Sequence, residues 1–497
     1  MQAPLIEGPG GGLATHLDPR HVPDQAWSNG RNVRFPTGGS RIRKTDGYTR
    51  IEQTRPAEPI RALWYYQAPG LEKYLVRITT ARAQAGRGAA AIQITDDASY
   101  QPATVDDVVT LTQYKEIMIW ADGGVNPVMR WNPGPFASPL FPAGIPNGKL
   151  VEMHKERLLL GHITNSGVAG AELQPWKVMY SAMDDPGNMT GSAENDTAGD
   201  WDFVDDNDPV VALKVLGNDA IVHKPNRIYR MIQVGGPQWY QVEQVPADDG
   251  AISARAAISI GSFQFFMGRG NFYRLASFTE PIGDAVWTEI EKTIDWSQVH
   301  RIYAYRRQEY DEVCWKIPQL GGAPDLSAVF NYRDQSWTFT DHDPGTCYAE
   351  IPQVPFLHEA AVSHLPLMVG IFGQTNGNIQ AYDTVNADGA PIHAWAESKH
   401  FTAGMNPAKI LAVACYASGT GVLSVSCRAA MELRQPMPTW GAAQPLPLFP
   451  ATNQTRPWID TRQYGRLWQI RLESQALWDD WEVSAYAPAV IPGGYAR

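Results

Sequence analysis

Short apolar runs separated by tight turns recur along most of this chain. In the segment 211–236, the apolar run 220–222 is followed across a turn by 228–229. In the segment 250–277, two aromatic runs flank the turn 268–271. Apolar runs joined by a turn that carries glycine or asparagine are typical of antiparallel hairpins. The pattern therefore predicts a chain built mainly of β-hairpins.

This hairpin unit recurs about seven times between Ile60 and Asp383, at roughly 40 to 50 residues per unit. The units begin near residues 60, 108, 150, 211, 250, 299 and 367. Such a period is typical of the blades of a β-propeller, in which each blade buries its apolar faces against its neighbours. No repeated WD dipeptide or kelch glycine pair marks the units, so a pair of sandwiches or a distorted barrel stays open as an alternative.

Both ends of the chain carry strand patterns outside this repeat. Polar and apolar positions alternate in 32–35 and 41–43, and again in 422–426 and 467–472, as in sheets with one buried face. We therefore predict an all-β protein, an irregular β-propeller of about seven blades with a smaller β-sandwich-like platform domain from the chain ends. The predicted segments are 1–58, an N-terminal β element that is part of the platform, 59–383, the propeller, and 384–497, the C-terminal platform domain.

Composition agrees with many short strands and turns, because the 497 residues include 17 Trp, 20 Tyr, 44 Gly and 38 Pro. The formal net charge is −11. Stable DNA binding needs clustered Lys and Arg to neutralise phosphates, and no such cluster dominates here. The nearest basic run, 31–50, is interpreted as a solvated or subunit-facing strand rather than a phosphate contact.

The 4 cysteines are widely spaced, so neither a zinc site nor a disulfide framework is indicated. Cys415 and Cys427 fall on successive predicted strands and could be neighbours, but buried free thiols are favoured. The sequence opens without a signal-peptide pattern and has no apolar stretch of about 18 residues. We expect no membrane-spanning segment, and a protein made and kept in a reducing cytoplasm until it reaches its destination.

Two groups of carboxylates are candidates for chemistry. The run Asp184 to Asp208 holds many acids and no Lys or Arg. It is interpreted as a solvated acidic loop, and Ca²⁺ binding stays open. Glu309, Asp311 and Glu312 could supply the two carboxylates of a glycosidase, but a solvent-facing edge is favoured.

Histidines and glycines give no stronger signal. His154, His162, His223 and His342 lack the spacing of a metal site on a helix, and no nucleophile elbow is present. The Gly268-Arg269-Gly270 segment is predicted to be a hairpin turn rather than a phosphate cradle, because it lies between two aromatic strands with no following helix. We therefore predict no catalytic residue, no cofactor and no metal, and a protein that is not an enzyme.

Several segments together resemble the β-propeller tail hub or nozzle proteins of short-tailed, podovirus-type bacteriophages. The segments are 27–35 (WSNGRNVRF), 44–48 (KTDGY), 180–186 (YSAMDDP), 226–229 (NRIY), 250–273 and 464–471 (YGRLWQIR). These are structural motifs spread over nearly the whole chain, and they carry over no catalytic residue.

The resemblance implies a virion tail protein that is assembled in the host bacterial cytoplasm as a homohexameric ring. Such a ring would lie below the portal and adaptor proteins, anchor fibres, spikes or a needle, and let double-stranded DNA pass without specific binding. The acidic composition is compatible with this role, because an acidic wall repels phosphate. Two alternatives stay open: a carbohydrate-binding propeller for host recognition, with Trp and Tyr stacking on sugars, and a glycosidase.

Overall fold

The computed structural model describes residues 5–38, 40–53, 56–67, 70, 73–87, 90–96, 99–191, 197–235, 239–321, 324–352, 368–382, 386–402, 406–432, 436–448 and 458–492. This part of the chain is nearly all strand, with one α-helix, α1 (Asp284–Thr293), and three short 3₁₀ turns, η1 (Pro142–Gly144), η2 (Trp296–Arg301) and η3 (Gln308–Tyr310). The predicted all-β class is confirmed.

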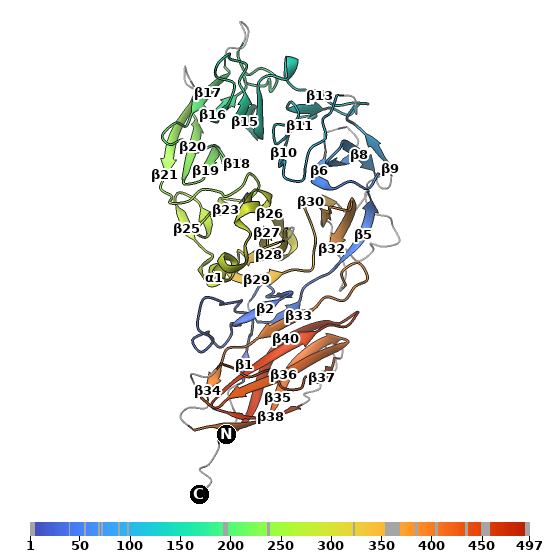
Figure 1. The fold of residues 1–497 in the computed structure, drawn as a ribbon, viewed down its shortest axis with the longest axis vertical. Coiled ribbons are helices and arrows are strands. Elements are labelled where there is room, and N and C mark those ends of the chain that lie inside the picture. Colours follow the sequence, from blue (N-terminus) through green and yellow to red (C-terminus); the bar gives the residue numbers. More distant parts are fainter. Residues whose placement is uncertain are drawn as a thin grey trace.

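Seven four-stranded antiparallel sheets form the blades of a propeller in the upper part of Figure 1. Blades one to four consist of β6 (Ile60–Tyr66), β7 (Tyr74–Thr79), β8 (Ala83–Arg87) and β9 (Ala90–Gln93); β10 (Val109–Tyr114), β11 (Ile117–Asp122), β12 (Met129–Trp131) and β13 (Ser138–Pro139); β14 (Asn147–His154), β15 (Arg157–Asn165), β16 (Gln174–Tyr180) and β17 (Gly199–Asp202); and β18 (Ala212–Leu216), β19 (Asp219–Lys224), β20 (Arg227–Gln233) and β21 (Tyr240–Val245).

The last three blades complete the circle. They consist of β22 (Ala257–Ile260), β23 (Phe263–Met267), β24 (Phe272–Leu275) and β25 (Thr279–Pro281); β26 (Tyr303–Arg307), β27 (Glu312–Pro318), β28 (Pro324–Asn331) and β29 (Ser336–Thr340); and β30 (Cys347–Pro352), β31 (Met368–Gly373), β32 (Asn378–Tyr382) and β5 (Tyr48–Gln53). The innermost strands contact one another in turn, and β30 contacts β6. The propeller is therefore a closed ring of seven blades, as the repeat predicts.

The seventh blade takes its outer strand from the start of the chain. Tyr48 pairs with Tyr382, and Thr49 pairs with Ala381, so β5 lies antiparallel to β32. The sequence interpretation placed this segment in the N-terminal platform element 1–58, and the structure assigns it to the propeller instead. The physical reason is that the early strand supplies the fourth strand of the last blade and pairs with β32, so the outer edge of blade seven is formed by a strand from the start of the chain.

Two six-stranded sheets, in the lower part of Figure 1, form a sandwich from both ends of the chain. One sheet contains β3 (Val33–Arg34), β4 (Ile42–Lys44), β40 (Asp480–Pro492), β35 (Ala408–Thr420) and β38 (Trp458–Gly465), with β1 (Ile6–Glu7) beside β40. The other contains β2 (Asn29–Arg31), β33 (Ala394–Glu397), β39 (Leu467–Ser474), β36 (Val422–Ala430) and β37 (Gln444–Pro447), with β34 (Phe401–Thr402) beside β39.

One apolar core runs from the sandwich into blades five and six. It joins Trp27 and Ile410 of the sandwich to Phe272, Trp315 and Trp337 of the propeller, all at most 2% exposed. The aromatic rings of Phe272 and Trp315 are 4.7 Å apart at their centroids, an attractive tilted contact. The alternating pattern of the sequence thus produces sheets whose inner faces share one core across the boundary between propeller and sandwich.

Candidate functional site

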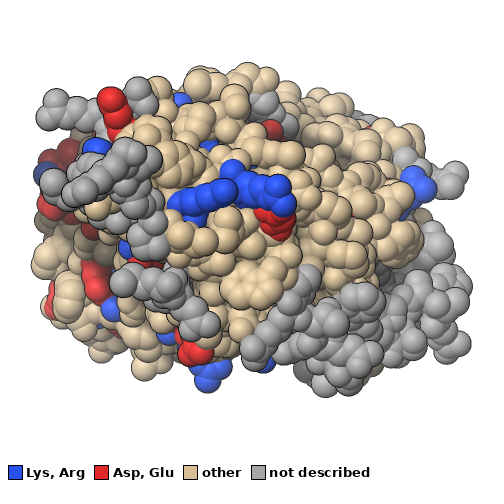
Figure 2. Space-filling view, turned by 90° about the horizontal axis from the view of Figure 1, so that it is seen from below, with Lys and Arg blue, Asp and Glu red and all other residues tan. Residues whose placement is uncertain are grey.

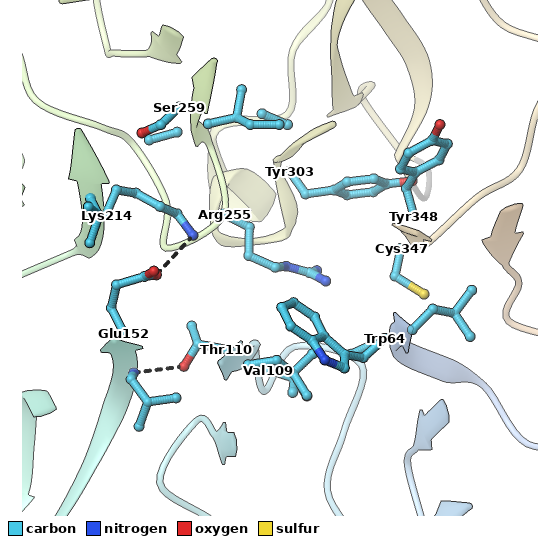
Figure 3. A pocket seen from close by; sticks show the side chains of 18 residues that line it. Trp64, Val109, Thr110, Glu152, Lys214, Arg255, Ser259, Tyr303, Cys347 and Tyr348 are labelled. Atoms are coloured by element: carbon cyan, nitrogen blue, oxygen red, sulfur yellow. Dashed lines mark hydrogen bonds and ion pairs between the residues drawn. The ribbon is translucent and has the colours of Figure 1, made fainter. Parts of the chain in front are cut away.

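The innermost strands of all seven blades surround a cavity of about 370 Å³ on the propeller axis, which we name the axial cavity. Its wall is mostly apolar, with Trp64 from β6 and Val109 from β10 among the lining side chains (Figure 3). A cavity of this size and lining is typical of a site for a small ligand. The axial cavity is therefore the first candidate binding site in the molecule.

Three charged side chains reach this apolar wall. Glu152 of β14 and Lys214 of β18 form an ion pair of 3.8 Å between blades three and four (Figure 3). Burial raises the pKa of Glu152, and the Lys214 charge opposes that change. Arg255, in the segment before β22, extends into the same cavity near Trp64 and Tyr303 (Figure 3). Its guanidinium carbon lies 5.3 Å from the centre of the Tyr303 ring.

The basic run 31–50 was interpreted as a solvated or subunit-facing strand. The structure buries some of its basic side chains inside the protein, so that interpretation is wrong for those residues. Arg34 and Lys44 are 3% and 1% exposed. Lys44 donates to the carbonyl of Asp479 at 2.6 Å, within the sandwich. Arg31 pairs with Glu289 of α1 at 3.2 Å. The basic residues of this run thus connect parts of the fold.

Arg34 belongs to a set of six charged side chains between sandwich and propeller, which we name the junction network: Arg34, Arg43, Asp46, Arg307, Glu309 and Glu312. Arg34 Nη2 lies 2.8 Å from Glu312 Oε1, and both side chains are 4% exposed. Arg34 Nη1 lies 2.7 Å from Asp46 Oδ2. The network therefore links β3 of the sandwich to blade six through charge-assisted hydrogen bonds.

Asp46 lies at the centre of the junction network. Burial alone would raise its pKa, but the guanidinium groups of Arg34, Arg307 and Arg43 hold the pKa well below its ordinary value. Glu312 was expected on a solvent-facing edge with Glu309 and Asp311; the structure instead buries Glu312 at 3% exposure. Its partner comes from a distant part of the chain, which adjacency in sequence cannot reveal.

The acids described between Asp184 and Asp208 are divided among different donors. Asp184 accepts from Tyr114, Asp205 accepts from Tyr229 and Asp208 accepts from Asn226. Lys177 pairs with Asp200 at 2.8 Å. Within the described ranges, no group of three or more His, Cys, Asp or Glu side chains could hold a metal ion. Glu194 and Asp196 of this run lie outside the described residues.

The turn 268–271 connects β23 and β24, as predicted for a hairpin. The N–H of Gly270 donates to Asp249 Oδ2 at 2.8 Å, and the Tyr273 hydroxyl donates to the same oxygen at 2.7 Å. A carboxylate of the protein thus occupies the position where a phosphate cradle would place its ligand. All four cysteines are free and buried, as expected, and burial raises the pKa of Cys415 and of Cys427 to about 12.

The four singled-out histidines connect elements of the fold. His154 Nδ1 lies 2.8 Å from the Tyr240 hydroxyl, which joins blades three and four. His162 Nδ1 lies 3.1 Å from the carbonyl of Val210. His342 Nε2 lies 2.9 Å from the carbonyl of Asp46.

His223 joins blades four and five, the pair that carries the clearest hairpin pattern. The N–H of Ala251 donates to His223 Nδ1 at 3.2 Å, so Nε2 carries the proton and donates to Gln264 Oε1 at 2.7 Å. The backbone at Gly250 packs closely against that of Lys224: a Cβ on Gly250 would lie 1.9 Å from the Lys224 carbonyl oxygen. Only glycine fits at position 250.

Acidification is expected to weaken the protein through His223. Burial lowers the pKa of this imidazole to about 4, below its unfolded value of 6.5. The folded protein keeps this imidazole neutral, whereas the unfolded chain takes up a proton below its unfolded pKa. The free energy of unfolding therefore falls by about 3 kcal/mol as the pH falls from about 7 to 4. Urea unfolding of a His223→Gln variant should show a smaller loss over this range than the unsubstituted protein. A His21→Gln control, at an exposed position, should keep the full loss; equal slopes for all three proteins would contradict the prediction.

Edge strand β38 presents a row of exposed side chains on the outer side of the sandwich. Among the strands that the structure describes, it pairs with β35 alone. Trp458 and Tyr464 are 58% and 51% exposed, and Asp460 and Arg462 lie between them on the same exposed face. From the sandwich end, most of the visible described surface carries neither acidic nor basic side chains (Figure 2). An unpaired edge with exposed aromatic residues is typical of a surface that contacts another chain.

The sequence interpretation did not single out Arg255, which lines the axial cavity, or Arg61, which is 4% exposed on β6. A charged residue inside an apolar run, as in the IRALWYY of β6, is the signal that could have identified Arg61.

Comparisons with known proteins add only similarities of shape. No protein-family model and no curated protein matches the chain. The WD40 domain of Neurospora crassa Pan2 is similar with a TM-score of 0.40 and 8% identity, over 67% of this chain and 95% of that domain. PorZ, a surface component of the type-IX secretion system of Porphyromonas gingivalis, gives 0.37 and 9%, over 76% of this chain and 44% of PorZ. Similarities this low carry no argument about what the chain binds or does.

Proposed function

We propose that this protein is a structural subunit of a bacteriophage tail, a hub or nozzle, that acts without catalysis. The observation that carries the proposal is the exposed edge of the sandwich, where one side of β38 pairs with no strand among the described residues, beside the exposed Trp458 and Tyr464. In a closed ring, each copy pairs such an edge with a surface of the next copy, and no edge remains open. The virion tail, the homohexamer and its partners, portal, adaptor and fibres or spikes, belong to this proposal.

Two further features support a scaffold. The junction network and the shared core fix the propeller to the sandwich, so that each subunit acts as one rigid block in an assembly. The segments that resemble tail proteins contribute Trp27 and Val33 to that core and Tyr48, the first residue of the closing strand, to the propeller.

The conduit for DNA would lie between subunits. The axial cavity of one propeller, at about 370 Å³, has the size of a small-ligand site rather than of a duplex channel. The net charge of −11 suits a wall along which a polyanion slides, because like charges repel. Among the described residues, no helix is long and apolar enough to cross a membrane.

Ring formation is expected to depend on β38. Replacing Trp458 and Tyr464 together with serine should weaken each subunit contact by about 2 kcal/mol or more, a factor of roughly 30 in the association constant. Mass photometry over a concentration series, with negative-stain electron microscopy of the assemblies, measures the effect. A Phe278→Ser control, which changes an exposed aromatic residue of the propeller, should assemble like the unsubstituted protein.

The alternatives predict different results. A protein that stays monomeric at every concentration, also with the adaptor present, and that binds glycans would overturn the tail proposal in favour of a carbohydrate-binding propeller. Turnover of bacterial surface polysaccharide would instead indicate a glycosidase. Genes for portal and head proteins beside the coding sequence would support the tail assignment independently of assembly.

A further inference from the structure

A cavity of about 480 Å³ lies beside the end of α1, and we name it the Trp296 cavity. Ile252 and Val299 form part of its apolar lining, and Arg269, Glu291 and Trp296 line it as well. Its volume lies in the range of about 300–1,000 Å³ that is usual for small-ligand sites. Among the described residues it shares none with the lining of the axial cavity, so it is a second, separate space.

Trp296 presents an exposed indole to this space. The residue is 41% exposed, although tryptophan is on average well buried. Within the described part of the chain, the indole forms neither a ring contact nor a hydrogen bond. Its backbone is fixed at the start of η2, because the Asp295 carboxylate accepts from the Ser297 N–H at 3.0 Å and the Asp295 N–H donates to the Pro318 carbonyl at 2.9 Å. Folding therefore positions an aromatic face and leaves it without a partner.

Arg269 and Glu291 provide opposite charges in the wall of the same cavity. Both side chains are exposed, and neither has a hydrogen bond or an ion pair to any residue that the structure describes. Glu291 lies near the C-terminal end of α1, where the helix dipole disfavours a carboxylate, so helix stability does not explain its presence. A free guanidinium supplies only donors, and a free carboxylate supplies only acceptors. Together they suit a ligand that offers both kinds of group.

The elements that carry these three side chains are tied to one another. Arg269 lies in the turn between β23 and β24. Asn271, in the same turn, donates through Nδ2 to Asp284 Oδ1 at 2.6 Å, and Asp284 is the first residue of α1. The helix in turn leads into η2, which begins at Trp296. A site built on such fixed elements loses little conformational freedom when a ligand binds.

We propose that the Trp296 cavity binds a neutral pyranose unit of a glycan. The C–H face of the sugar ring would lie on the Trp296 indole, because the negative face of an aromatic ring attracts the weakly positive C–H groups. Each sugar hydroxyl both donates and accepts, so neighbouring hydroxyls match the donors of Arg269 and the acceptors of Glu291.

A proline-rich peptide is the other class of ligand that stacks on exposed aromatic residues. Its proline backbone offers carbonyl acceptors and no N–H, so it would give the Glu291 carboxylate no donor. One donor-only and one acceptor-only side chain beside the same indole therefore favour the sugar.

The sugar site is complete within one subunit and does not depend on the tail proposal. The two proposals fail separately. Trp296→Ala should assemble as the unsubstituted protein does, and the Trp458→Ser/Tyr464→Ser variant should still bind the sugar.

Binding is measured with the full chain on an array of oligosaccharides built from neutral hexoses and N-acetylhexosamines, and the tightest binder is then titrated calorimetrically. We expect one site per chain. Trp296→Ala should weaken binding at least tenfold, because the stacking surface is lost. Arg269→Ala and Glu291→Ala should each weaken binding about tenfold, since each removes hydrogen bonds to a charged group.

The matched control is Trp478→Ala, because Trp478 is 67% exposed in the sandwich, and this variant should bind like the unsubstituted protein. All four substituted positions are exposed, so each variant should keep the thermal melt of the unsubstituted chain. The proposal is overturned if no oligosaccharide of the array binds or if Trp296→Ala binds as tightly as the unsubstituted chain. It is also overturned if an oligoproline peptide binds through Trp296 and no sugar does.

Discussion

Replacement of Arg34 by methionine is expected to lower the free energy of unfolding by about 3–5 kcal/mol. The substitution leaves Glu312 buried without its main partner and removes one of the three guanidinium groups around Asp46. Breaking a buried ion pair from one side is costly because the remaining charge stays desolvated. Equilibrium unfolding in urea, followed by tryptophan fluorescence, measures the loss.

A double variant serves as the control for this interpretation. Arg34→Met combined with Glu312→Met removes both charges of the 2.8 Å pair, and packed apolar groups often replace such a pair at little cost. We expect the double variant to regain most of the lost stability, with Asp46 still held by Arg43 and Arg307. A single variant within about 1 kcal/mol of the unsubstituted protein would show that the junction network contributes little.

Removal of residues 1–53 is expected to abolish cooperative folding. The truncation leaves blade seven with three strands and takes β1 to β4 from the sandwich, which exposes apolar surface in both parts. Soluble yield and a thermal melt by circular dichroism measure the result. A truncated chain that melts like the full chain would contradict the proposed closure.

Cutting the backbone after folding tests the contribution of the N-terminal segment without removing any residues. A protease site inserted between Pro56 and Ala57, both exposed, allows the backbone to be cut after folding. Because β1 to β4 pair within the sandwich and β5 pairs with β32 over five residues, the two fragments should elute together under native conditions and separate only in denaturant. Separation of the fragments in native buffer would show that neither the sandwich strands nor the β5 pairing holds the N-terminal segment in place.

The period of apolar runs was enough to predict seven blades, because hairpins are local and their turns have distinct residues. Pairing between distant segments was not predictable from the same signals. Nothing in the YTRIEQ of β5 distinguishes a strand of the seventh blade from a strand of the sandwich. Register across more than three hundred residues depends on partners that only the folded chain brings together.

The same limit applies to the sites. In the sequence, Glu312 and its neighbours resemble a solvent-facing edge. The Arg34 side chain that pairs with the buried Glu312 carboxylate comes from another sheet. His223 lacked a metal pattern, and its actual partners, Gln264 and Ala251, follow 41 and 28 positions later. Arg61 and Arg255 lie in separate apolar segments, and only ring closure brings the Arg255 guanidinium within 3.0 Å of the Arg61 carbonyl.

Closure by the early strand β5 also sets the order of events during synthesis. Tyr48 leaves the ribosome 334 residues before its partner Tyr382, since 382 − 48 = 334. At about 5–20 residues per second, roughly 20 to 70 s pass before the last blade can close. A polypeptide released early by a translation error therefore ends with an open, unfinished circle.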